Sequence, residues 1–242
     1  MKPHFLIVLI TTLICNEIQS QIFNKEFSIN SIYSLNEINE IRLSNTGAKL
    51  DVCFFRKFET RKSNDKFIYI THHKSGEDVA VFEEINLYYG TDDHLILKNK
   101  LIKNADESYY FIEPILFDYY IESERKLVQL IIIRAKFPGT GDFYEDYIYE
   151  LTCGNDNLYD IEKISYTIQP FHSVLPKKQG VWKGPAIDFN ENLKFIRPIW
   201  NKTDGNCCPT GGFIIGNFKL LRKKDRYYFK IEKYKIIPDK KD

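Results

Sequence analysis

Four of the five cysteines carry the most specific chemistry in this chain. Cys53 and Cys153 stand alone in the sequence, whereas Cys207 and Cys208 are adjacent. An even number of thiols in an exported chain is typical of disulfide bonds, and four thiols allow three pairings among which sequence does not choose. No zinc site is expected, because zinc ligands come in closely spaced pairs and the two earlier cysteines have no such neighbours.

Two tryptophans and an aspartate are the candidate binding residues. Trp182 lies in an irregular segment and Trp200 precedes the paired cysteines, so two exposed indoles would offer a stacking surface for a sugar or a peptide. Packing at the edge of the core is the alternative. Asp204 adds a carboxylate, which also suits an ordinary Asx turn. The segment 201–203 (Asn-Lys-Thr) fits the acceptor pattern for N-glycosylation.

Acidic residues and a histidine supply the parts of an alternative hydrolase site. Asp142, Glu145 and Asp204 would provide carboxylates, as in glycoside cleavage, and His172 would act as an acid or base. That site requires the side chains to converge in a cleft, with two carboxyl groups about 5 to 10 Å apart. No nucleophile with a positioned base stands out. We therefore assign no catalytic residue and favour a role other than catalysis.

The segment 207–212 is the most specific motif of the chain, and it reads Cys-Cys-Pro-Thr-Gly-Gly. It resembles the Cys-Cys-Pro-Ser/Thr-Gly-Gly segment near the C-terminus of uncharacterised secreted bacterial proteins, where a β-hairpin rich in aromatic residues also follows. The resemblance covers residues 190–237. It implies an exported β module and no particular activity. We expect a disulfide-pinned turn here, with a rigid ligand-contacting loop as the alternative.

The first 20 residues have the features of a secretory signal peptide. Lys2 precedes the apolar run Phe5–Cys15, and a polar stretch ends at Ser20, so cleavage is expected before Gln21. The run is shorter than the roughly 20 residues that span a bilayer. Lipidation of Cys15 is not expected, because Ile14 stands where a small residue is needed. The mature chain should be periplasmic or secreted, with no transmembrane segment.

The charge of the chain is balanced, with 34 Lys and Arg against 33 Asp and Glu and a formal net charge of +1. There is no global field to attract nucleic acid, and no nucleic-acid partner, cofactor or metal is expected. Residues 218–242 are locally basic. We interpret them as a solvated strand face, with a surface for an anionic ligand as the alternative.

The elements that must position these residues are short strands. Apolar and aromatic runs recur between turn-forming clusters, which predicts a mainly β fold, an antiparallel sheet or a sandwich or barrel, with at most one or two short helices. Ser34 and Glu37 suggest a capping box that begins a helix over 34–43. The four apolar residues Leu130–Ile133 indicate a central strand. Strands are expected at 50–55, 66–71, 79–82, 94–97, 109–112, 127–133, 143–153, 158–167, 193–201, 213–221 and 227–237, and the segment 114–121 is aromatic and acidic.

The simplest organisation is one monomeric domain over residues 21–242. The irregular stretch 169–186, rich in Pro and Gly, marks the place where two subdomains would join. The last two strands and their basic turn at 222–226 predict a hairpin. The sequence thus favours an exported β protein with a binding or structural role in the cell envelope or outside the cell. The alternatives are an exported hydrolase and a protein that binds partners through an open strand edge.

Overall fold

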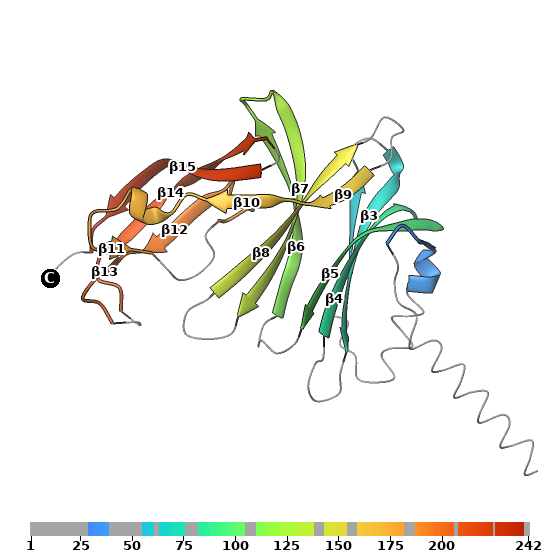
Figure 1. Ribbon diagram of the computed structural model, residues 1–242, viewed down its shortest axis with the longest axis horizontal. Coiled ribbons are helices and arrows are strands. Elements are labelled where there is room, and N and C mark those ends of the chain that lie inside the picture. Colours follow the sequence, from blue (N-terminus) through green and yellow to red (C-terminus); the bar gives the residue numbers. More distant parts are fainter. Residues whose placement is uncertain are drawn as a thin grey trace, which may run out of the picture. The chain divides into compact units, whose positions relative to one another are not determined.

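The chain folds into mainly antiparallel sheets, as the sequence predicts (Figure 1). It divides into two compact units at residues 1–104 and 105–242. The expected junction at 169–186 lies inside the second unit. None of the described helices is long and apolar enough to cross a membrane. The computed structural model describes residues 29–38, 55–60, 63–75, 82–104, 110–137, 143–153, 159–181, 187–205, 208–224 and 226–239.

The first unit is built on a sheet with the strand order β1-β5-β4-β3-β2, in which all neighbours are antiparallel. Its buried residues are mainly aromatic and branched, including Tyr69, Tyr88 and Leu97. The strands are β1 (Ile32–Tyr33), β2 (Phe55–Thr60), β3 (Ser63–Ser75), β4 (Phe82–Thr91) and β5 (His94–Asn104).

The capping box is present. The Ser34 backbone N–H donates to Glu37 Oε2 at 2.8 Å, and the Glu37 N–H donates to Ser34 Oγ at 3.2 Å. A helical turn follows over 35–38, and the rest of the expected helix lies outside the described residues.

The second unit begins with a sheet that we call the middle sheet from its place along the sequence. Its order is β6-β7-β8-β9, formed by β6 (Tyr110–Ile121), β7 (Lys126–Phe137), β8 (Phe143–Cys153) and β9 (Tyr159–Lys163). Leu130–Ile133 lies within β7, an interior strand, and is buried on both faces, which confirms that prediction. β6 runs as one strand through Pro114, whereas the strand expected from the sequence ends at Ile112. Proline is tolerated there because β6 is the edge strand and its pairing with β7 shifts between Ile112 and Ile115.

A C-terminal sheet completes the second unit, in the order β10-β15-β14-β12, with β10 (Ser165–Ile168), β12 (Lys194–Pro198), β14 (Phe213–Lys223) and β15 (Arg226–Ile237). β14 and β15 form the expected hairpin, with Lys223 paired to Arg226. Lys224 in the turn has a positive φ of 56°, as two-residue hairpin turns require. β10 runs parallel to β15 along residues 226–229.

An aromatic core joins the two sheets of the second unit. Phe189 forms edge-to-face contacts with Phe117 of the middle sheet and Phe229 of the C-terminal sheet, at centroid distances of 5.5 and 6.0 Å. Phe171, in the 3₁₀ turn η1 (Phe171–Ser173), packs on Phe195 and Phe218. Phe171, within the irregular stretch, therefore contributes to this core.

Candidate functional site

The loop between β13 (Trp200–Asn201) and β14 is closed by the carboxylate of Asp204. Asp204 Oδ2 accepts hydrogen bonds from the backbone N–H groups of Asn201 at 2.7 Å and Thr210 at 2.9 Å, and Oδ1 accepts one from Thr210 Oγ1 at 2.6 Å. These bonds, with that from the Thr210 hydroxyl largest, lower the pKa of the Asp204 carboxyl. The Asx-turn interpretation describes this geometry, since both carboxylate oxygens bind the loop itself.

Trp200 is part of the base of the same loop. Its side chain is only 4% exposed, and its indole Nε1 donates to the Gly205 carbonyl at 3.2 Å. The ring therefore does not present an open stacking surface, and its burial favours the packing alternative. Trp182 lies outside the described residues.

Asn201 is held through both atoms of its side-chain amide. Nδ2 donates to Thr210 Oγ1 at 2.9 Å, and Oδ1 accepts from Gln179 Nε2 at 3.0 Å. The second bond lies beside the pairing of β11 (Gln179–Gly180) with β13. The contacts of both amide atoms favour a packing role for this residue.

The two glycines of the motif allow close backbone contacts. A Cβ on Gly211 would lie 2.6 Å from Ile199 Cγ2, so this position accepts only a residue without a side chain. Gly212 has a φ of +82°, and a Cβ there would collide with the Ile237 carbonyl and lie 2.6 Å from the Asp239 nitrogen. The Thr-Gly-Gly part of the motif thus joins the loop to Ile199, between β12 and β13, and to the end of β15.

The other sequence-predicted residues are on separate elements. Glu145 is exposed on β8, and His172 is exposed in η1. Asp142, Cys53 and Cys207 lie outside the described residues, as does the side chain of Cys153, and Cys208 is exposed. The disulfide pairings therefore stay predictions.

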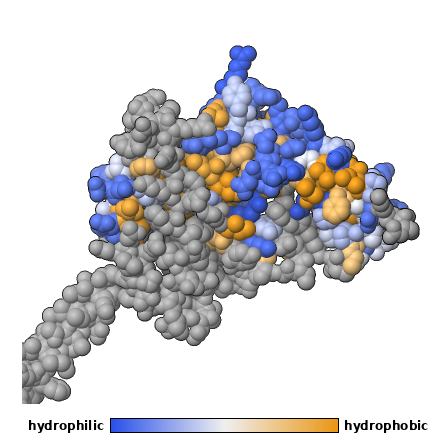
Figure 2. Space-filling view, turned by 180° about the vertical axis from the view of Figure 1, so that it is seen from behind, coloured by the Kyte–Doolittle hydropathy of each residue, from blue (hydrophilic) through white to orange (hydrophobic). Residues whose placement is uncertain are grey.

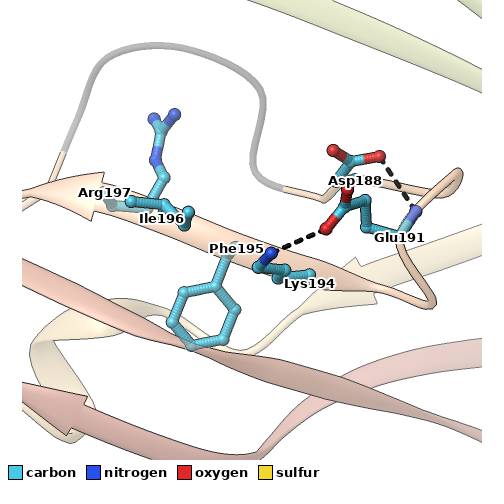
Figure 3. Close-up of a pocket in the computed structure, with 6 residues that line it drawn as sticks. All are labelled: Asp188, Glu191, Lys194, Phe195, Ile196 and Arg197. Carbon is cyan, nitrogen blue, oxygen red and sulfur yellow. Dashed lines mark hydrogen bonds and ion pairs between the residues drawn. The ribbon is translucent and has the colours of Figure 1, made fainter.

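A hollow of about 320 Å³ lies along the start of β12 (Figure 3). Asp188 Oδ1 accepts from the N–H groups of Asn190 at 3.0 Å and Glu191 at 3.2 Å, and Lys194 Nζ donates to Glu191 Oε2 at 2.6 Å. These bonds stabilise the turn that precedes β12. Burial lowers the pKa of the Arg197 guanidinium to about 10, which leaves it charged at neutral pH. The lining residues are Asp188, Glu191, Lys194, Phe195, Ile196 and Arg197.

A more exposed feature is the outward side of the C-terminal sheet, which we call the apolar-basic face. Strand register aligns Pro198, Phe213 and Ile237 in one row, and Ile196, Ile215 and Lys235 in the next row on the same side. Ile196, Phe213 and Ile237 are 53%, 48% and 41% exposed. Figure 2 shows hydrophobic residues gathered over this part of the chain. Lys194 and Lys233 follow in the third row.

Beside this face, β15 has an open edge, which we define as residues Glu232–Ile237. The parallel partner β10 ends its pairing at Phe229, and no described strand lies next to β15 beyond it. All residues of the open edge are exposed. The sequence leaves an open strand edge as an alternative but does not locate it, because the end of the β10 pairing is not visible in a hydrophobic pattern.

The chain matches no protein family, no curated protein and no solved structure. The resemblance of segment 207–212 to secreted bacterial proteins therefore stays a prediction. Within the described ranges, no group of three or more His, Cys, Asp or Glu side chains is arranged to hold a metal ion.

The role of Asp204 predicts a pH-dependent stability. A carboxyl whose folded pKa lies below the ordinary value of 3.8 stabilises the fold above that value, and the contribution is lost as the pH falls through the folded pKa. Asp204→Asn should lower the melting temperature at neutral pH, and the difference from the wild type should shrink below about pH 4. Thermal melts of both proteins between neutral pH and below about pH 4 test this pH dependence. A constant difference at all pH values would contradict the charge-based contribution.

Gly212 should be intolerant of a side chain. Gly212→Ala adds a Cβ at a positive φ against the end of β15, and we expect a loss of more than about 1 kcal/mol in the free energy of unfolding, measured by urea denaturation. Gly205→Ala in the same loop is the matched control, since nothing lies within 4 Å of its Cβ position. Equal stability of the two variants would show that the close contact is unimportant.

Proposed function

We propose that this protein is exported and acts by binding a partner through its C-terminal sheet. The single observation that carries the binding role is the open edge of β15 next to the apolar-basic face. Exposed apolar residues that are contiguous and bordered by polar ones are typical of interaction surfaces. The signal-like residues 1–20 support export.

The position of the acidic residues also favours binding over hydrolysis. Asp204 uses both oxygens to close its loop, and Asp146, next to Glu145 on β8, is paired with Arg134 at 2.5 Å from Nε to Oδ1. A hydrolase would need carboxylates that face a cleft and are available to substrate. The carboxylates of Asp204 and Asp146 instead stabilise a turn and a strand pair.

Export predicts a defined N-terminus. The chain expressed in a bacterial host should appear outside the cytoplasm without residues 1–20, and N-terminal sequencing of that material should begin at Gln21. A variant with Leu6→Arg and Leu9→Arg, which interrupts the apolar run, should stay in the cytoplasm uncleaved. Cytoplasmic retention of the unaltered chain would contradict export.

Binding is tested by selecting peptides from a random dodecapeptide display library on the immobilised mature protein. Selected peptides should lose at least tenfold in affinity for Ile196→Ser and for Phe213→Ser, because both side chains are exposed on the apolar-basic face. Ile102→Ser on β5 is the control, since Ile102 is 54% exposed and Ile196 is 53% exposed. The proposal is wrong if no peptide is enriched, or if all three variants bind the selected peptides like the wild type.

A further inference from the structure

Among the described residues, no strand pairs with the outer side of the open edge. A strand directs its N–H and C=O groups to both sides in alternation, and only β14 occupies one side of Glu232–Ile237 among the described strands. Another polypeptide strand supplies the matching donors and acceptors. A lipid surface or a small anion supplies no such ladder.

The side chains of the open edge alternate in chemistry. Lys233 and Lys235 lie on the outward side, in register with Asn217 and Ile215. Tyr234 and Ile236 lie on the other side, in register with the buried Gly216 and Ile214, and they are 47% and 37% exposed. An added strand would therefore meet two ammonium groups on one face and two apolar side chains on the other.

These lysines are available for a charged partner. In the described part of the chain, the outward lysines Lys194 and Lys219 form ion pairs with Glu191 and Glu122, whereas no ion pair involves Lys233 or Lys235. Pairing of two copies along β15 would bring lysines of one copy close to lysines of the other, and like charges across strands are destabilising. The charge therefore favours an acidic partner over a second copy.

We infer that the open edge binds an extended acidic segment of another polypeptide, which joins the C-terminal sheet as a strand beside β15. Acidic side chains of that segment lie next to Lys233 and Lys235, and the apolar side chains between them lie next to Tyr234 and Ile236. This inference rests on the proposed function, because it names the class of partner for the same surface.

The test uses fluorescein-labelled octapeptides and the mature chain. A peptide that alternates glutamate with valine should bind, measured by fluorescence anisotropy, and one that alternates lysine with valine should not. The double variant Lys233→Glu with Lys235→Glu should bind the acidic peptide with at least tenfold lower affinity and should bind the basic peptide. Lys177→Glu with Lys178→Glu, two exposed lysines of the same unit, is the matched control and should behave like the wild type.

Backbone pairing is tested with two N-methylated forms of the acidic peptide, one methylated at the glutamates and one at the valines. Strand addition predicts that one form loses at least tenfold in affinity and the other does not, because alternate N–H groups face the edge. Equal binding of both methylated forms would overturn the inference. It would also be overturned if the wild-type protein bound no peptide but sedimented with phosphatidylglycerol vesicles. If library peptides depend on Ile196 but are neither acidic nor sensitive to methylation, the inference fails and the proposed function stands.

Discussion

The close backbone contact between Gly212 and the end of β15 is the constraint on which the C-terminal sheet depends. It fixes the point where β14 begins against the residues that end β15. The neighbouring Ile199 N–H donates to the Gly212 carbonyl at 2.8 Å, and the Gly211 N–H donates to the Ile199 carbonyl at 2.9 Å. The loop closed by Asp204 is thereby continuous with β12 on one side and the hairpin on the other. The open edge keeps its position because this loop holds its last residue.

Aromatic rings pack the inner side of the C-terminal sheet in the second unit. Phe195 and Phe218 lie at a centroid distance of 4.8 Å, with Phe171 placed edge-on against both. Gly216 sits between them in sequence, and a Cβ there would lie 2.7 Å from Phe195 Cζ. A glycine inside a strand costs backbone entropy, and here it leaves room for the ring. The sheet is therefore packed by rings on its inner side, and its apolar residues on the outward side remain exposed.

Local features of this fold were predictable from sequence. The capping box, the buried run in β7 and the β14–β15 hairpin depend on residues close together in the chain, so their patterns carry the information. The strand expected at 79–82 overlaps β4 only at Phe82. Ile85, Leu87 and Tyr89 alternate along β4, and they are buried together with their neighbours. The core role of Phe171 was not predictable, because its partners are on strands that follow much later. The apolar-basic face needs the register of three strands before its residues are seen together.

The parallel pairing of β10 with β15 determines which sheet of the second unit can form first. Ser165 pairs with Arg226, so β10 has no neighbour in the C-terminal sheet until β15 has been synthesised. The middle sheet has no such delay, since β6 to β9 pair in sequence. Contacts between distant residues form slowly, because a long loop must close first. We therefore expect the second unit to fold in two stages, with the sheet β6-β7-β8-β9 formed before the C-terminal sheet, and a chain that stops before β15 would leave β10 unpaired.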